Sequence, residues 1–211
     1  MLRITEIFYS LQGESNTSGW PTIFIRLTGC PLRCQYCDSA YAFKGGEKKT
    51  FTTILQEISR YRCKRICVTG GEPLAQPACY TFLTLLADQG YQVSIETSGA
   101  RPIAGIDNRI TIVMDLKTPD SKEEPKNLYA NIKLLKPCDQ IKFVICSRKD
   151  YDWSVKQLST LAIPHDVDIL FSPSWHDLKP QELAQWILDD NLQVRFQLQL
   201  HKILWQDCPG R

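Results

Sequence analysis

The sequence predicts an α/β fold: a partial barrel of about six parallel strands with helices outside it, and one additional strand at the N-terminus. Short β-rich runs alternate with helical segments along the chain, and this alternation is typical of a parallel sheet covered by helices. The 211 residues can build one full core but are too few for a complete eight-fold barrel. We therefore expect a single domain over residues 1–211.

The expected strands are short and mostly apolar. Residues 1–10 alternate in polarity as a strand does, and a polar, Gly-containing loop follows them. The run from Ile110 to Met114 has no charged residue, which indicates a strand buried on both faces. In chain order, strands are expected at residues 1–10, 21–27, 65–69, 93–96, 109–115, 140–145, 168–171 and 194–199.

The expected helices begin at residues suited to a first turn. Thr52 or Thr53 can cap a helix whose apolar positions recur at helical spacing, and Pro180 suits the first turn of the last helix. The expected helices span about 54–61, 76–89, 126–135, 150–161 and 180–190.

Conspicuous polar groups follow the ends of the expected strands. In parallel α/β folds, active sites are built at the face where the strands' C-terminal ends lie. We therefore expect these groups to converge on one opening. They are Gly29-Cys30, Thr69-Gly70-Gly71-Glu72, Glu96-Thr97-Ser98, Asp115-Leu116-Lys117, Ser172-Pro173 and Gln199-Leu200-His201.

Composition narrows the classes of function. A formal net charge of +2 argues against a nucleic-acid-binding surface and favours a small-molecule partner. No apolar run approaches a membrane span, and the N-terminal residues lack the apolar core of a signal peptide. We therefore expect a cytoplasmic protein with no membrane partner.

Three closely spaced cysteines, Cys30, Cys34 and Cys37, indicate a metal centre. Thiolate ligands favour zinc or an iron–sulfur cluster. A structural zinc would need a fourth ligand, and the nearby residues offer only Asp38. A [4Fe–4S] cluster held by three cysteines would leave one iron free to bind another molecule. The alternatives are a zinc site completed by a distant Cys or His, and cysteines without a ligand role.

The other six cysteines show no paired spacing, so a disulfide framework is not expected. We expect them to be small buried apolar residues. They are Cys63, Cys67, Cys79, Cys138, Cys146 and Cys208.

The C-x3-C-x2-C triad, with Gly70-Gly71-Glu72-Pro73 one β/α unit later, resembles the radical S-adenosylmethionine (SAM) superfamily. The resemblance implies a partial TIM-like (β/α)6 barrel of the radical SAM type with an N-terminal strand extension. It also implies that the open iron chelates SAM. One electron from the reduced cluster then breaks the S–C5′ bond, and the 5′-deoxyadenosyl radical abstracts hydrogen from the substrate.

Flanking motifs along essentially the whole chain resemble the 7-carboxy-7-deazaguanine synthase family. They are Leu11-Gln12-Gly13-Glu14, Phe24-Ile25-Arg26-Leu27, Cys37-Asp38-Ser39, Ile95-Glu96-Thr97-Ser98-Gly99, Asp115-Leu116-Lys117-Thr118-Pro119, Gln140-Ile141-Lys142-Phe143 and Gln199-Leu200-His201-Lys202.

This second resemblance implies a specific lyase activity. Such an enzyme converts 6-carboxy-5,6,7,8-tetrahydropterin to 7-carboxy-7-deazaguanine with loss of ammonia, on the pathway to queuosine and other 7-deazapurines. The ring contraction begins with hydrogen abstraction from C6 of the pterin. The family needs Mg²⁺ and regenerates SAM each turnover. The resemblance further implies a homodimer and an electron donor such as flavodoxin or ferredoxin.

The resemblance also assigns roles to residues. It implies that the cluster and the SAM radical carry out the chemistry and that no side chain is catalytic. Cys30, Cys34 and Cys37 would ligate the cluster, and Ser39 would ligate Mg²⁺. The expected SAM contacts are Tyr36, Cys37, Asp38, Gly71, Glu72, Asp115, Leu116, Lys117, Ser172 and Pro173. The expected substrate contacts are Leu11, Gln12, Gly13, Arg26, Thr69 and His201.

Several assignments have a structural alternative. Many family members have Ser-Pro-Lys where this chain has Asp115-Leu116-Lys117. The resemblance therefore supports a SAM contact at Asp115 less strongly than at Lys117. Arg26 could form a structural ion pair, and His201 could be a structural residue. The tail, residues 207–211, falls where the family closes over the pterin.

Two other functions compete with this one. A radical SAM activase that installs a glycyl radical on a partner protein would share the cluster loop, but it would not explain the first and last motifs. An electron-transfer or zinc-structured binding module would normally have a fourth nearby cysteine.

Overall fold

The fold is built on one open, mostly parallel sheet in the computed structural model, which describes residues 1–206, 208 and 210. Its strand order is β3-β1-β2-β4-β5-β6-β7-β8-β9; β1 is antiparallel to both of its neighbours, and β2 and β4–β9 are parallel. The edge strands β3 and β9 do not pair with each other, so the expected partial barrel with an N-terminal strand extension is confirmed. The strands are β1 Leu2–Leu11, β2 Pro21–Leu27, β3 Glu47–Lys49, β4 Arg65–Gly70, β5 Gln92–Thr97, β6 Thr111–Asp115, β7 Gln140–Ile145, β8 Asp168–Pro173 and β9 Arg195–Phe196.

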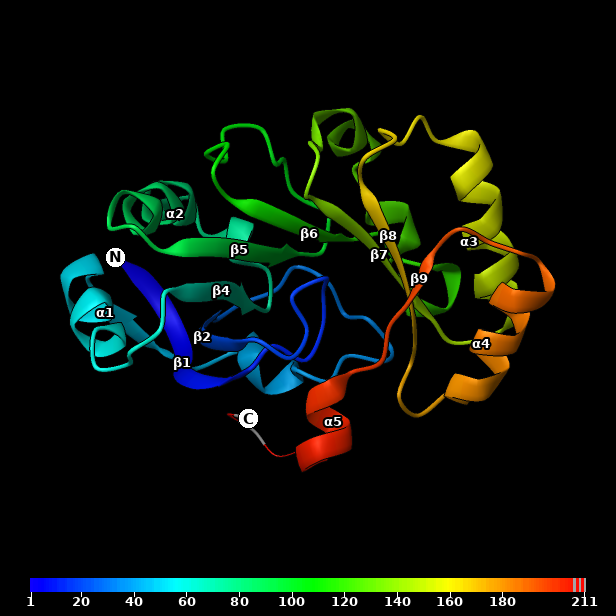
Figure 1. The fold of residues 1–211 in the computed structure, drawn as a ribbon. Helices are drawn as coiled ribbons and strands as arrows, with labels where there is room; N and C mark the ends of the chain where they lie inside the picture. Colours follow the sequence, from blue (N-terminus) through cyan, green and yellow to red (C-terminus); the bar gives the residue numbers. More distant parts are fainter. Residues whose placement is uncertain (207, 209, 211) are drawn as a thin grey trace.

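The α-helices cover the outer face of this curved sheet (Figure 1). Helices α1 and α2 pack against the β1–β5 half, and α3 and α4 pack against β7 and β8. The last helix, α5, lies instead beside the loops at the mouth of the sheet. The α-helices are α1 Phe51–Ile58, α2 Ala78–Asp88, α3 Arg148–Thr160, α4 Pro180–Asp189 and α5 Leu200–Trp205, and short 3-10 helices are η1 Ala40–Phe43, η2 Pro73–Ala75, η3 Pro119–Ser121, η4 Glu124–Lys126 and η5 Tyr129–Leu134.

The core lies between the sheet and its helices. Buried aliphatic side chains from the outer face of β2, β4 and β5 pack against α1 and α2. In the other half, Tyr151 of α3 meets Phe171 of β8 edge-on, and its hydroxyl donates a 2.9 Å hydrogen bond to the carbonyl of Trp186 in α4. The opposite, concave face of the sheet is left to the polar groups at the strand ends.

A β-bulge in β1 changes which face its side chains occupy. Ile4 pairs with Leu27 and Glu6 pairs with Arg26, so Thr5 is an extra residue in β1. Ile4 therefore packs in the core, whereas Glu6, two residues later, lies opposite Arg26 on the concave face. Bulges next to active sites commonly re-aim a side chain in this way.

Three local predictions were wrong. The helix expected at 126–135 is replaced by the 3-10 turns η4 and η5. Its Asn131 is buried and binds another loop, accepting from the Ile103 amide and donating to the carbonyls of Gly99 and Arg101. These three bonds hold the 99–103 segment and favour a shorter turn over a regular helix.

The last strand is shorter than predicted, and β3 was not predicted. Beyond Phe196 the chain turns to the first loop, because the Gln197 amide both donates to and accepts from the backbone of Ser15. Strand β3 pairs with the start of β1, and Arg3 donates to the carbonyls of Gly45 and Gly46 at its turn.

The six cysteines outside the triad do not share one environment. Cys67 and Cys79 are buried as expected, whereas Cys138 and Cys208 are exposed, so the expectation of burial was wrong for these two. Cys63 and Cys146 are partly buried.

Candidate active site

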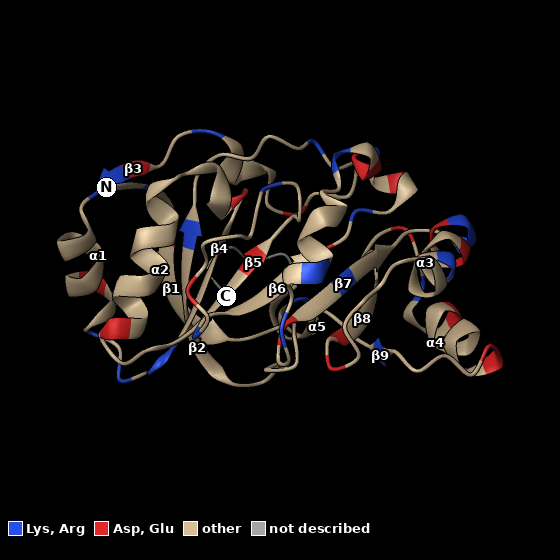
Figure 2. Cartoon of the chain, turned by 90° about the horizontal axis from the view of Figure 1, so that it is seen from above, with Lys and Arg blue, Asp and Glu red and all other residues tan. Residues whose placement is uncertain are grey.

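The expected opening exists as a cavity of about 580 Å³ at the C-terminal ends of the parallel strands. Strands β5 and β7 each carry one charged residue, the acidic Glu96 and the basic Lys142, on an otherwise uncharged strand (Figure 2). Both residues line the cavity. Of the expected site residues, those that line the cavity are Leu11, Gln12, Gly13, Arg26, Cys30, Cys34, Tyr36, Cys37, Asp38, Ser39, Thr69, Gly71, Asp115, Lys117, Ser172, Pro173 and His201.

The three cysteines of the triad face this cavity from one loop. The Leu32 amide lies 3.4 Å from Cys30 Sγ, and the Cys37 amide donates to the Cys34 carbonyl over 3.2 Å. Within residues 1–206, 208 and 210, no three His, Cys, Asp or Glu side chains converge on the position of one metal ion. Three thiols from one loop that line the same cavity fit the three-cysteine ligand set expected for a [4Fe–4S] cluster.

Burial raises the pKa of the Cys34 thiol to about 11 and also raises the pKa of Cys30. Metal ligation requires the thiolate form, so binding of a metal here would release the protons of these thiols.

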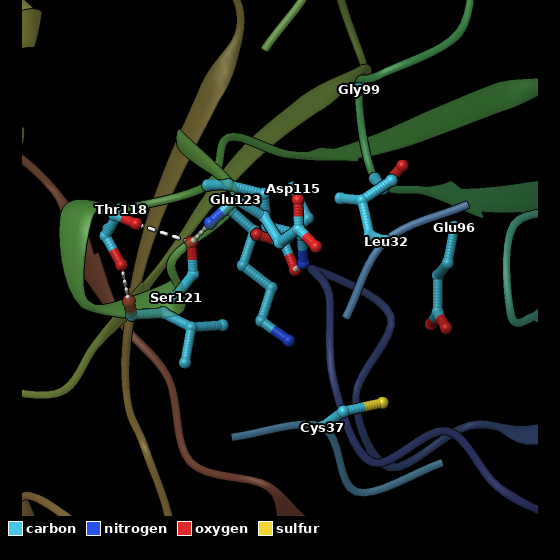
Figure 3. Close-up of polar contacts among 12 residues, drawn as sticks. Leu32, Cys37, Glu96, Gly99, Asp115, Thr118, Ser121 and Glu123 are labelled. Atoms are coloured by element: carbon cyan, nitrogen blue, oxygen red, sulfur yellow. Dashed lines mark hydrogen bonds and ion pairs between the residues drawn. The ribbon is translucent and has the colours of Figure 1, made fainter. Parts of the chain in front are cut away.

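A turn at residues 118–123, drawn in Figure 3, is hydrogen-bonded to the cysteine loop. The Ser121 hydroxyl donates to the Thr118 carbonyl and accepts from the Glu123 amide. Glu123 in turn accepts from the Arg33 amide, and the Ser121 carbonyl accepts from the Gln35 amide over 3.1 Å. The loop between β6 and β7 thereby fixes the backbone that carries the cysteines.

The glycines after β4 permit a close backbone approach. A Cβ on Gly71 would lie 2.3 Å from the Gly29 carbonyl oxygen and 2.9 Å from Cys30 Cβ. Gly70 has a φ of +145°, and a Cβ there would meet the backbone of Leu27. The turn after β4 must therefore be glycine for the cysteine loop to pack against it.

Two buried polar atoms at the cavity lack a partner among the described residues. They are the Tyr36 hydroxyl and Asp115 Oδ1, while Asp115 Oδ2 accepts from Lys117 Nζ over 2.8 Å. Buried polar atoms are almost always hydrogen-bonded, so a polar ligand at this position accounts for both. Burial raises the pKa of Tyr36, so its hydroxyl keeps its proton and can donate.

A group of polar residues occupies the opposite side of the cavity. Thr69 donates to Glu96 Oε2 over 2.7 Å, and the Gln12 amide approaches the other oxygen at 3.4 Å. The Arg26 guanidinium lies beside them and donates through Nε to Glu6 over 2.7 Å. This side can recognise a polar, planar molecule that carries an anionic group.

The last loop closes the site against the first loop. The Leu200 amide donates to the Gly13 carbonyl over 2.9 Å, which places His201 against Gly13. Glu14 forms an ion pair with Lys142 and accepts from Gln199 over 2.8 Å. Burial alone would raise the pKa of Glu14, but the Lys142 ammonium holds it at about 2.

Comparisons with known proteins identify the family. A model of the radical SAM superfamily matches residues 24–156. The 7-carboxy-7-deazaguanine synthase of Koribacter versatilis (strain Ellin345) is 40% identical, with 97% of this chain and 97% of the relative covered. That of Chlorobaculum tepidum is also 40% identical, with 97% and 94% covered. The chain belongs to the 7-carboxy-7-deazaguanine synthase family of radical SAM enzymes.

The crystal structure of QueE from Escherichia coli has the same fold, with a TM-score of 0.79 at 24% identity, covering 95% of this chain and 94% of that one. Membership in the radical SAM superfamily implies a [4Fe–4S] cluster and SAM. The cysteine loop, the glycine turn and the unpartnered atoms of Tyr36 and Asp115 fit these two groups.

Two residues predicted to contact SAM lie away from the cavity of this synthase-family chain. The Glu72 side chain is fully buried, and its carboxylate accepts hydrogen bonds from Thr97 Oγ1, the Ser98 amide and hydroxyl, and the Leu74 amide. Leu116 packs in the core. Glu72 therefore supports the glycine turn, and its side chain is not placed to balance the charge of a bound amine.

Other cavity residues had no role in the sequence prediction. Glu14 and Lys142 occurred only within family motifs, whereas Glu96 and Gln199 were also among the strand-end polar groups expected at the opening; all four line the cavity. For Glu14, a position in the loop after β1 was the available signal, and for Lys142 it was a lone charge on an otherwise uncharged strand. The tail prediction for 207–211 falls partly on Asp207, Pro209 and Arg211, which lie outside the described residues.

Over the described part of this family member, no helix is long and apolar enough to cross a membrane.

Proposed function

We propose that the protein converts 6-carboxy-5,6,7,8-tetrahydropterin to 7-carboxy-7-deazaguanine with loss of ammonia, in the biosynthesis of queuosine and other 7-deazapurines. The observation that carries this proposal is the full-length similarity to proteins named for that product, at 40% identity. The chain would act as a single radical SAM domain.

The substrate would bind on the side of the cavity that holds Arg26, Thr69 and Glu96. The planar guanidinium suits the substrate carboxylate, because it can form two parallel hydrogen bonds. Glu96 offers a carboxylate to the N–H groups of the pterin, and Gln12 lies beside it. Leu11, Gly13 and His201 would complete the pocket from the first and last loops.

The cofactors would occupy the side nearer the cysteine loop. Cys30, Cys34 and Cys37 would hold the cluster, and Tyr36 and Asp115 would bind polar groups of SAM through their unpartnered atoms. When bound, the reduced cluster supplies the electron that cleaves SAM and thereby starts the radical reaction. The remaining contacts proposed for SAM are Asp38, Gly71, Lys117, Ser172 and Pro173.

A Mg²⁺ ion would bind at Ser39, between the two sides. Ser39 lines the cavity, and its hydroxyl does not cap the following helix η1, although it lies 3.9 Å from Cys37 Sγ. A hard cation prefers oxygen ligands and keeps several waters, so one hydroxyl together with the substrate carboxylate is a suitable set.

The protein would work as a cytoplasmic homodimer that receives electrons from a small carrier such as flavodoxin or ferredoxin. A small-molecule substrate agrees with the size of the cavity and with the chain's low net charge.

The experiment uses protein reconstituted anaerobically to about four irons per chain, with SAM, Mg²⁺, dithionite and the carboxylated tetrahydropterin. We expect 7-carboxy-7-deazaguanine to form in excess of SAM consumed, and Cys37→Ala to lack both cluster and product. SAM cleavage to 5′-deoxyadenosine without a deazaguanine product would contradict the proposal and favour an activase. Stoichiometric zinc without SAM cleavage would favour a binding module.

A further inference from the structure

Glu6 holds Arg26 at the edge of the cavity. Its Oε1 accepts from Arg26 Nε over 2.7 Å, and the same oxygen accepts from the Tyr41 hydroxyl over 2.7 Å. The Arg26 and Glu6 side chains are only 18% and 22% exposed. The guanidinium carbon also lies 5.9 Å from the Phe8 ring and 5.8 Å from the Tyr41 ring.

This arrangement leaves one edge of the guanidinium available. The bond to Glu6 uses Nε, and no side chain or carbonyl in the described part of the chain accepts from Nη1 or Nη2 of Arg26. A carboxylate bound in two parallel hydrogen bonds can use these two terminal nitrogens. The pair with Glu6 and binding of a second carboxylate are therefore compatible.

The geometry also depends on the bulge in β1 and on the position of helix η1. The bulge at Thr5 places Glu6 directly opposite Arg26, whereas a regular strand would turn Glu6 into the core beside Ile4. Tyr41 lies in η1, two residues after Ser39. Glu6 thus connects the arginine of β2 to the helix that follows the cysteine loop.

We propose that Glu6, with Tyr41, is a positioning residue that orients Arg26 so that its Nη1–Nη2 edge faces the carboxylate of the substrate. A free arginine side chain has about 2 kcal/mol of rotamer entropy to lose on binding. The contacts with Glu6, Tyr41 and Phe8 restrict the side chain before the substrate arrives, which raises affinity for a carboxylate in particular. This inference rests on the proposed function.

The test compares two ligands on reconstituted protein with SAM and Mg²⁺ under anaerobic conditions. One is 6-carboxy-5,6,7,8-tetrahydropterin, and the other is tetrahydropterin with hydrogen in place of the carboxylate. For Glu6→Gln we expect the Kd of the carboxylated ligand to rise about 10-fold, with the Kd of the analogue unchanged. KM should rise more than kcat falls. Tyr41→Phe removes one hydroxyl only, and a smaller change of the same selectivity is expected.

A double-mutant cycle separates positioning from a general structural role. In an Arg26→Gln background, Glu6→Gln should have no further effect on the Kd of the carboxylated ligand. Glu57→Gln is the matched control: it breaks the ion pair with Lys49 between α1 and β3, away from the cavity. This control should leave both affinities unchanged.

Three outcomes would overturn the inference alone: equal weakening of both ligands, full additivity with Arg26→Gln, or wild-type selectivity retained in both Glu6→Gln and Tyr41→Phe. Wild-type protein that fails to prefer the carboxylated ligand would instead overturn the proposed function, and this inference with it.

Discussion

Gly13 and His201 are in direct contact across the mouth of the cavity: a Cβ on Gly13 would lie 2.1 Å from His201 Nδ1 and 3.0 Å from the His201 amide nitrogen. The two residues belong to the first and last loops, 188 positions apart. A side chain at position 13 would therefore have to displace the last loop and with it one wall of the site.

We predict that Gly13→Ala reduces kcat/KM by about 100-fold, because a displacement of about 1 Å in a positioned site has an effect of this size. Gly105→Ala is the control. Gly105 has a φ of +89° and no atom within 4 Å of an added Cβ, so this change should lower stability by about 1–2 kcal/mol and leave activity unchanged. Steady-state kinetics and thermal unfolding distinguish the two variants. Full activity in Gly13→Ala would show that the last loop is not part of the site.

We predict that Glu72→Gln destabilises the protein by about 2–4 kcal/mol, because the new amide N–H₂ would face donors that the carboxylate now accepts from. The measurement is the free energy of unfolding in urea. Glu124→Gln, which keeps an oxygen acceptor for the Tyr129 hydroxyl at an exposed position, should change stability by less than about 0.5 kcal/mol. A stable Glu72→Gln variant with weakened SAM binding would restore the original assignment of Glu72 as a cofactor contact.

The position of the site was predictable because it follows from strand order. Local patterns located β2 and β7 with their observed bounds, and parallel strands bring their C-terminal ends to one face. Residues that end a strand, such as Arg26 and Thr69, were therefore placed correctly at the cavity.

The errors have a different physical origin, which is hydrogen bonding between distant segments. Asn131 binds a loop about 30 residues away, and Gln197 binds Ser15 across 182 positions. Glu72 likewise binds Thr97, the last residue of β5, and Ser98, which follows it. Local polarity does not reveal which buried partner a polar side chain will find, so helical content and the role of Glu72 could not be predicted.

We predict that the stabilising effect of Glu14 disappears in acid. The pKa of Glu14 falls from 4.5 to about 2 on folding, so its ionised form stabilises the fold fully above pH 4.5, and this stabilisation is lost as pH falls toward 2. Glu14→Gln should be less stable than wild type at pH 7, by an amount on the order of 1–3 kcal/mol. The difference should shrink by pH 3. Urea unfolding at both pH values measures it, and a difference independent of pH would contradict the ion pair with Lys142.

We predict that Ser39→Ala raises the Mg²⁺ concentration needed for half-maximal turnover by about 10-fold or more, since even indirect partners of a metal change affinity by 10–100-fold. Iron content and SAM cleavage should remain as in wild type, because Ser39 is not one of the cysteine ligands. Ser39→Thr keeps a hydroxyl and should retain most of the Mg²⁺ response. Loss of iron in Ser39→Ala would give the residue a structural role in the cysteine loop instead.

We predict that Asp115→Asn weakens SAM binding by about 10-fold or more, because a hydrogen bond to a charged acceptor contributes about 1.5–3 kcal/mol. Asp115 Oδ1 is buried at the cavity and has no partner in the described part of the chain, and Lys117 donates to the other oxygen. An asparagine would keep the shape of the side chain but remove the charge that Lys117 requires. The measurement is equilibrium binding of SAM to the reconstituted protein, with Asp107→Asn as a control, since Asp107 pairs with Arg109 outside the cavity. Unchanged SAM affinity together with a loss of stability would limit Asp115 to holding Lys117. Weakened affinity with the cluster intact would assign the unpartnered oxygen to the cofactor.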